Sequence, residues 1–503
     1  MRPRPAPLAK ARRSLAAPLA KARRSLAAPL AKARRSLAAP LAKACAVLAF
    51  ALAPASCSEP SPPPRAASAA PAPAPAPTPP VEAEASASEQ ADAAALVDAM
   101  LQRVTRARRL ASRGAVRSRV LERKSLIEQV KKRVETDVPA DVVRAQGEVL
   151  VALGLIPPDY DYEAGVYELL EAQLAGYYEP SDKTMYLAGD LEGDDADATL
   201  AHELVHALQD QHFDLAPRLA YRDDGGDPAA ATQALAEGDA MSAMFDVLLE
   251  GRATALDMPE HVLALQMRTS QMLMPRAQSV PSLLRASLIA PYLDGLLFAN
   301  ALRRRGGWAA VDRAWRRPPA TTEQLLHPDK YEKNEKAKPV PPPPGDALGG
   351  GFRVRYTDTQ GEQALRLMFE EWGPLDKAAA AAAGWGGDRV SLLVRPRDGR
   401  QEQFAVWWVR FDESGPSCSE AAEAYRFASR TFPAQAGQGD PAFRCRERPD
   451  LGPLAIARNG CDLLFMAGPF VRSPNPRASS ATCSDLRGWS TKRLAEGERR
   501  PRP

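Results

Sequence analysis

The stretch from Ala198 to Leu215 reads ATLAHELVHALQDQHFDL and holds three of the five histidines in the chain. His202 and His206 are four residues apart, and Glu203 follows the first of them. On an α-helix this spacing places both imidazoles on one face, one turn apart, where they can bind one ion together. Glu203 stands beside them, where a carboxylate can take a proton from a metal-activated water molecule. The stretch therefore predicts a metal-binding helix; an ordinary helix that carries two histidines is the alternative.

A catalytic zinc site uses three protein ligands and one open position, so a third ligand is needed. His212 follows His206 by six residues, as in the metzincin pattern H-E-x-x-H-x-x-G-x-x-H, but Gln209 stands where that pattern has a helix-breaking Gly. Glu237 lies in ALAEGDA, on a second predicted helix. This arrangement resembles gluzincins such as thermolysin, in which a Glu from a following helix completes the site. We expect Glu237 as the third ligand, with His212 as the alternative.

The resemblance extends beyond the histidine helix. The motifs HELVHALQDQHFDL, EGDA and GGW…TTEQLLHPDKY resemble a group of bacterial lipoprotein-type zinc metallopeptidases over about residues 140–335. The resemblance implies that His202, His206 and Glu237 bind Zn²⁺ and that Glu203 is the general base. Asp239 is expected to orient one of the ligand histidines through its second ring nitrogen.

Peptide hydrolysis also needs a donor to the carbonyl oxygen that becomes negatively charged. The candidates are His327, Tyr331, Tyr292 and Tyr178; core packing is the alternative for each tyrosine, and a helix end is the alternative for His327. A zincin places its substrate against a strand beside the zinc helix. We expect that edge strand to be the one containing Tyr186.

The N-terminal 57 residues predict export. An eleven-residue repeat, PLAKARRSLAA, leads into a basic flank, a short apolar run and small residues, which is the order of a signal peptide. The run is too short to span a membrane. Cys57 follows it and resembles the lipidated Cys of a bacterial lipoprotein, with plain cleavage as the alternative. We expect a cell-envelope protein that is anchored in the membrane through Cys57.

The charge distribution gives no indication of a nucleic-acid partner. Residues 1–57 contain 12 Lys and Arg and no Asp or Glu. The rest of the chain has 54 basic and 62 acidic side chains, a net charge of −8. An acidic body lacks the positive surface that phosphate backbones require.

Four cysteines lie in the C-terminal part of the chain: Cys418, Cys445, Cys461 and Cys483. An oxidising compartment would permit two disulfides among them, and three pairings are possible. We expect Cys445–Cys461 and Cys418–Cys483, with four buried thiols as the alternative.

Composition and periodicity divide the chain into six segments. These are a repeat-extended signal peptide at 1–57, a Pro/Ala-rich linker at 58–90, a metallopeptidase domain at 91–335, a Pro/Gly-rich linker at 336–350, an α+β domain at 351–490 and a tail at 491–503. Residues 91–136 are helical in pattern and rich in Arg and Lys. The expected fold class is α+β: a mainly helical, zincin-like catalytic domain with a small β-hairpin, followed by a smaller α+β domain.

The most direct interpretation of these patterns is a zinc metallopeptidase of the cell envelope, with a peptide or protein as its substrate. The alternative is a non-catalytic envelope lipoprotein whose zinc site is structural or vestigial and which binds a partner. A structural site has no need of a base, so Glu203 favours the enzyme.

Overall fold

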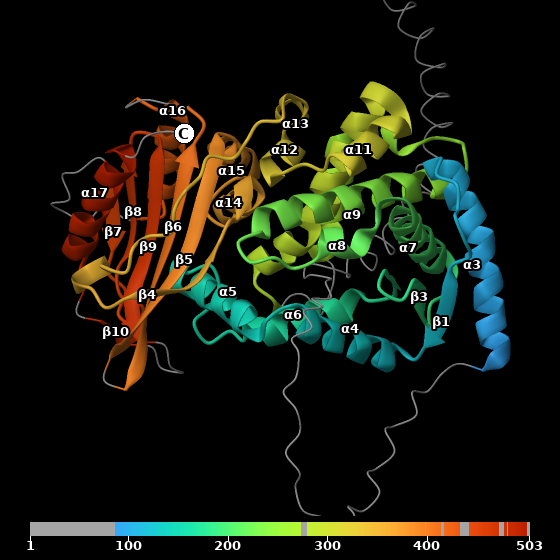
Figure 1. Cartoon of the computed structure of the whole chain (residues 1–503), viewed down its shortest axis with the longest axis horizontal. Helices are drawn as coiled ribbons and strands as arrows, with labels where there is room; N and C mark the ends of the chain where they lie inside the picture. The colour runs from blue at the N-terminus through green and yellow to red at the C-terminus, as the bar shows by residue number, and fades with distance from the viewer. Residues whose placement is uncertain are drawn as a thin grey trace, which may run out of the picture.

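The computed structural model describes residues 86–272, 279–397, 399–413, 417–432, 442–471, 477–479 and 481–499 (Figure 1). Within these residues the chain is α+β, as the sequence predicts. A long antiparallel sheet lies at one end of the molecule and the helix α3 at the other (Figure 1). The repeat, the apolar run, Cys57 and most of the Pro/Ala-rich linker lie outside the described residues, so what we expect of them stays a prediction.

Helices dominate the chain up to residue 333. They are α3 (Ala87–Arg108), α4 (Arg123–Asp137), α5 (Ala140–Leu153), α6 (Tyr162–Gln173), α7 (Gly193–Phe213), α8 (Leu215–Leu219), α9 (Gly226–Leu248), α10 (Glu260–Met272), α11 (Ser282–Arg316), α12 (Thr322–Leu326) and α13 (Pro328–Lys333), with a 3₁₀ turn η2 at Ala255–Asp257. The helical pattern of residues 91–136 predicts one feature wrongly. A strand, β1 (Arg117–Leu121), separates α3 from α4. Its side chains alternate between exposed and more buried positions, as they do in a strand.

A small three-stranded sheet lies beside α7. The predicted hairpin is confirmed as β2 (Gly176–Glu179) and β3 (Thr184–Ala188), which pair antiparallel, and β1 pairs parallel with β3. The order β1-β3-β2 places the Tyr186 strand in the middle of the sheet. The expectation that this strand is the edge is therefore wrong, because β1 comes from a segment that was expected to be helical. Within the described residues, β2 is the edge strand next to α7.

The crossing of α9 and α11 is unusually close because it is made by two glycines. A Cβ added to Gly238 would lie 1.9 Å from the carbonyl carbon of Gly295, and one added to Gly295 would lie 1.8 Å from the carbonyl oxygen of Ala234. Only a residue without a side chain fits at either position. Although α11 is long and apolar enough to cross a membrane, 72% of its apolar window is buried inside the protein, as in a core helix.

The C-terminal part is built on a seven-stranded sheet, counted over the described residues. The strands are β4 (Arg353–Asp358), β5 (Trp385–Arg397), β6 (Arg400–Phe411), β7 (Phe443–Arg446), β8 (Leu454–Asn459), β9 (Asp462–Val471) and β10 (Arg477–Ala478), in the order β4-β5-β6-β9-β8-β7 with β10 on β9. Helices α14 (Gly361–Glu370), α15 (Leu375–Ala382), α16 (Ser419–Ser429) and α17 (Cys483–Arg499) accompany it, with a 3₁₀ turn η4 at Ala347–Gly349. Residues 491–503 were expected to form a tail. Residues 491–499 instead belong to α17, and Leu494 in this helix is buried.

The two parts share a core. One face of the sheet packs α14 to α16 together with α5 and the first turns of α11, so that Val149, Leu284 and Trp407 belong to one buried cluster. The linker at 336–350 also follows the sheet: the Lys338 amide donates to the Gly386 carbonyl at 2.6 Å, and Val340 is buried. The helical part is therefore packed against the sheet through α5 and the start of α11.

Candidate metal centre

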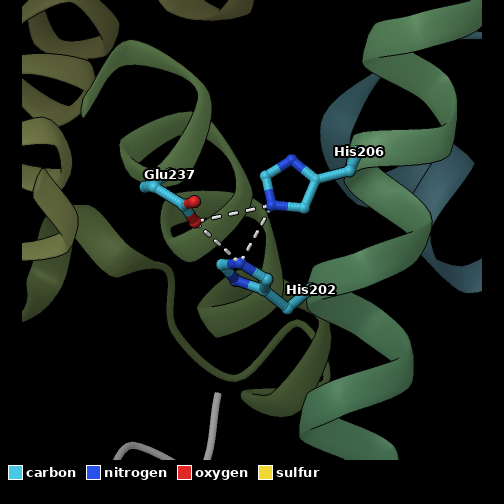
Figure 2. A group of neighbouring side chains, drawn as sticks. All are labelled: His202, His206 and Glu237. Atoms are coloured by element: carbon cyan, nitrogen blue, oxygen red, sulfur yellow. Dashed lines mark hydrogen bonds and ion pairs between the residues drawn. The ribbon is translucent and has the colours of Figure 1, made fainter. Parts of the chain in front are cut away.

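Three side chains from α7 and α9 converge in the interior of the helical part. His202 Nε2 lies 3.1 Å from Glu237 Oε2 and 3.1 Å from His206 Nε2, and His206 Nε2 lies 3.5 Å from Glu237 Oε2. Figure 2 shows both rings on one face of α7, directed at the carboxylate on α9. The i, i+4 spacing and the helix crossing together produce the arrangement that the sequence suggested.

The spacing of the three atoms suits a zinc ion. Four ligands held tetrahedrally at about 2.0–2.1 Å from a common ion lie about 3.3 Å from one another. The distances of 3.1, 3.1 and 3.5 Å match this value closely. Two imidazole nitrogens and one carboxylate oxygen are also the donor types that zinc prefers in catalytic sites. His202, His206 and Glu237 could therefore hold a zinc ion.

The position of Glu237 follows from the helix crossing described above. Its neighbour Gly238 touches Gly295 on α11, so α9 cannot shift or rotate at this point without a backbone clash. Glu237 is almost fully buried, with 1% of its surface exposed. Burial raises its pKa, but the two histidines outweigh burial and lower it below the usual value, which keeps the carboxylate ionised. Burial lowers the pKa of His206, but the Glu237 carboxylate outweighs burial and raises it to about 9. A cation at this site would therefore bind with release of the His206 proton.

Gln209 fixes the ring of His206. The Gln209 amide nitrogen donates to the Ala236 carbonyl at 3.0 Å and to Asp239 Oδ2 at 3.1 Å, which leaves its oxygen to accept from His206 Nδ1 at 2.8 Å. In the neutral ring, His206 Nε2 then carries the lone pair and faces His202 and Glu237. Asp239 was expected to contact a ligand histidine directly. Asp239 instead accepts from the Gln209 amide, and Gln209 contacts His206.

Asp239 is itself held by distant parts of the chain. Arg108, at the end of α3, donates to both of its carboxylate oxygens, and the Trp315 indole nitrogen donates to Oδ2 at 2.8 Å. Arg108 and Asp239 are both fully buried and pair with each other, which offsets the cost of burying either charge. Sequence reasoning missed Arg108, Gln209 and Trp315. Only Gln209 gave a signal, because it occupies the Gly position of the metzincin pattern.

Glu203 lies one residue from His202 but is not among the three converging ligands. Its Oε2 accepts a hydrogen bond of 3.0 Å from the backbone amide of Tyr178 on the edge strand β2. Burial raises the pKa of Glu203, although the two histidines oppose this effect. A buried carboxylate with a raised pKa beside His202 and His206 is suited to accept a proton.

His212 does not reach the cluster. Helix α7 continues to Phe213, so His212 points away, and its Nε2 donates to the Ala111 carbonyl at 2.7 Å. The alternative third ligand is therefore wrong in this structure. The physical reason is the one that the sequence offered: Gln209 continues the helix where a Gly would break it.

Two of the four expected carbonyl-oxygen donors lie elsewhere. His327 pairs with Glu362 on α14 at 2.8 Å, and the Tyr331 hydroxyl donates to the Arg317 carbonyl at 2.9 Å. Neither belongs to the group formed by His202, His206 and Glu237. Tyr178 contacts Glu203 through its amide, and the Tyr292 ring centroid lies 5.9 Å from that of His202. The Tyr178 hydroxyl donates to Asp210 at 2.9 Å, so Tyr292 is the candidate that remains beside the site.

A second acidic group, formed by Glu323, Glu335 and Asp412, also has the spacing of a metal site. Lys330 occupies it, with its Nζ 2.6 Å from Glu323 and 3.5 Å from Glu335, and in contact with Asp412. An internal ammonium group therefore already neutralises these carboxylates.

The cysteine pairing differs from the prediction. Cys445 on β7 is bonded to Cys483 at the start of α17, with Cα atoms 5.8 Å apart. Both residues pack against one face of the sheet, whereas Cys418 and Cys461 pack against the other face. The expected pairs Cys445–Cys461 and Cys418–Cys483 would each have to pass through the sheet, so they are wrong. Cys418 and Cys461 contact each other as thiols, and burial raises the pKa of Cys461 to about 12.

Comparison with known proteins identifies only part of the chain. Residues 352–475 match the family described as Domain of unknown function (DUF8575). The match covers most of the C-terminal sheet and does not reach His202, His206 or Glu237. Neither the curated proteins nor the solved structures contain a match to this chain.

Proposed function

We propose that this protein is a zinc-dependent peptidase and that its helical part has the zincin architecture. The observation that carries the proposal is the convergence of His202 Nε2, His206 Nε2 and Glu237 Oε2 at zinc-ligand spacing, with Glu203 on the same helix. The edge strand β2 beside α7 supports it, because zincins bind an extended substrate along such an edge. A structural zinc site would need four protein ligands and no base.

Each residue of the site has a proposed role in peptide hydrolysis. A zinc ion at this site would act as a Lewis acid, lowering the pKa of water and polarising a peptide carbonyl. Glu203 accepts the proton of the attacking water and transfers it to the leaving amine. The Tyr178 amide holds one oxygen of Glu203, so the other oxygen stays oriented for this transfer. Tyr292, whose ring contacts His202, is the proposed donor to the carbonyl oxygen.

The test compares wild type with Glu203→Gln. We expect one zinc per chain in both proteins, measured by atomic emission, and casein cleavage by wild type alone. Zinc binding without cleavage of casein or of a mixed peptide library would favour a structural site and a role in binding a partner. Full activity of Glu203→Gln would show that another site performs the hydrolysis.

We also propose that the protein is exported and anchored in the membrane through lipid on Cys57. The Cys445–Cys483 bond supports export, because disulfides persist in oxidising compartments. Labelling of cells with radioactive palmitate should mark wild type and leave Cys57→Ala unlabelled. If both proteins remain unlabelled and are recovered in the periplasm, the N-terminal segment is an ordinary cleaved signal.

A further inference from the structure

A cavity of about 340 Å³ lies directly beside the metal cluster, and both His206 and Glu237 form part of its wall. The cavity lies between the helical part and the C-terminal sheet. Helices α5, α9 and the start of α11 line it from one side, and β4, β5, β6 and α14 line it from the other. The segment that matches the domain of unknown function therefore contributes to a space that opens onto the candidate zinc ligands.

The wall of the cavity is mainly apolar. Val149 and Leu153 on α5 and Leu284 on α11 face Leu367 on α14 and Trp407 on β6. These side chains are buried in the folded protein, yet they border a space that is large enough for several side-chain groups. The cavity is partly open to solvent, so a ligand can enter it, and apolar pockets of this size bind apolar groups.

Polar groups in the same wall indicate that the ligand also has backbone-like hydrogen-bonding groups. The Oε1 atom of Gln146 is buried and, among the described residues, has no hydrogen-bond donor. Amide side chains from both parts, Gln233 and Gln360, line the cavity as well. A hydrocarbon chain would leave such an acceptor unsatisfied at a cost, whereas a peptide N–H would satisfy it.

We infer that this cavity binds the substrate peptide through a large apolar side chain, such as Leu or Phe, next to the bond placed at the metal cluster, and that the C-terminal sheet forms half of that binding site. The inference rests on the proposed peptidase function for the position of the bond. It assigns a role to the matched segment: residues from α14, β5 and β6 select the substrate.

The test fills the cavity from the C-terminal side. Ala364 on α14 lines the cavity and is half-buried, so Ala364→Phe places a ring in the space. Ala379 on α15 is also helical and half-buried but does not line the cavity, which makes Ala379→Phe the matched control. Ala230→Phe fills the cavity from α9 on the opposite wall, in case the first variant does not fold.

Binding is measured by calorimetry in the zinc-loaded Glu203→Gln background, so that the peptides survive. The probes are two blocked hexapeptides that differ only at two central residues, Leu-Phe in one and Gly-Ser in the other. We expect the Leu-Phe peptide to bind about 10- to 100-fold more tightly, the range that burial of one large apolar side chain provides. Ala364→Phe and Ala230→Phe should abolish this preference, and Ala379→Phe should keep it. Zinc content should be the same in all variants.

The outcomes separate the two proposals. Equal binding of both peptides, or an unchanged preference in folded Ala364→Phe protein, overturns the inference even if wild type cleaves casein. Selective binding without any cleavage by wild type overturns the peptidase proposal and supports the cavity as a peptide site. Tighter binding of palmitate than of the Leu-Phe peptide, lost in Ala364→Phe, would assign the cavity to an acyl chain and also overturn the inference.

Discussion

His206 donates from Nδ1 to the amide oxygen of Gln209 at 2.8 Å, and this contact determines which ring nitrogen faces His202 and Glu237. The orientation of the Gln209 amide is itself fixed, because both of its N–H groups are used by Ala236 and Asp239. Removal of a group that orients a ligand histidine typically costs 10- to 100-fold in metal affinity. We therefore expect the Gln209 side chain to affect the affinity of this site for a metal ion.

We expect Gln209→Leu to weaken zinc binding roughly 10- to 100-fold, because the ring of His206 loses its acceptor. Competition against a chromophoric chelator measures this change. Gln211→Leu, two residues later on the same helix, is the control, since Gln211 contacts Arg113 and Gly114 at the protein surface. Equal zinc affinities for the two variants would mean that Gln209 does not position His206.

The second prediction separates the base from the ligands. Glu203→Gln should keep zinc and lower peptidase activity by about 10²- to 10⁴-fold, the usual contribution of a general base. His206→Ala and Glu237→Ala should lose both zinc and activity, since each removes a ligand atom. Metal content and kcat are measured on the same preparations. Retention of bound zinc by His206→Ala would remove this residue from the ligand set.

The third prediction concerns the glycine crossing. Gly238→Ala should destabilise the protein by at least about 1–3 kcal/mol, because the new Cβ would lie 1.9 Å from the Gly295 backbone and α11 must move. Urea denaturation measures the change. Gly488→Ala in α17 is the control: no atom lies within 4 Å of its added Cβ, so stability should stay equal or rise slightly. Zinc affinity should fall in Gly238→Ala alone, because Glu237 moves with its neighbour.

A fourth prediction concerns the pH dependence of stability. Asp227, at the start of α9, is buried, and burial raises its pKa to about 7; Asp388 and Glu362 add to the effect, and hydrogen bonds from Thr322 oppose it. The folded state thus binds a proton that the unfolded state has released above pH ~4. The stabilising contribution of the protonated group is complete below that pH and is lost as pH rises through 7.

Asp227→Asn removes this titration and keeps the oxygen that accepts from Thr322. Between pH 5 and pH 8 we expect wild type to lose stability relative to Asp227→Asn by on the order of 3 kcal/mol. Urea unfolding at several pH values provides the measurement. Parallel stability curves for the two proteins would show that Asp227 stays ionised in the fold.

The fifth prediction concerns the disulfide. Peptide mapping without reductant should recover Cys445 joined to Cys483. The bond closes a segment of 38 residues, so Cys483→Ser should cost about 4 kcal/mol by the loop-entropy relation. Cys461→Ser serves as the control and should have a smaller effect. Recovery of Cys445 joined to Cys461 would restore the pairing that the sequence suggested.

The convergence of His202, His206 and Glu237 could be predicted from sequence because its determinants are local. A four-residue spacing on one helix and a Glu on another helix within about 35 residues place His202, His206 and Glu237 without knowledge of the whole fold. The support of the cluster could not be predicted in this way. Arg108 stands 131 residues before Asp239, and nothing in the basic stretch around it distinguishes this arginine from its neighbours.

The errors share this cause. The pairing of β1 with β3 and the faces on which the cysteines lie depend on contacts between segments far apart in the chain. A single sequence shows the hydrophobic periodicity of each segment, but it does not show which distant segments contact one another. The cavity likewise has no sequence signal, because its wall is assembled from α5, α9, α11 and the C-terminal sheet.

Because α5, the start of α11 and the C-terminal sheet share one core, we expect the protein to fold as one cooperative unit. Cleavage in the linker at 336–350 should not release two separately folded fragments, because each would expose half of that core to water. The chain should melt in a single transition, and a C-terminal segment expressed alone should aggregate. Evolution could therefore not exchange the matched segment for an unrelated domain. Any replacement would have to preserve the interface with α5 and α11.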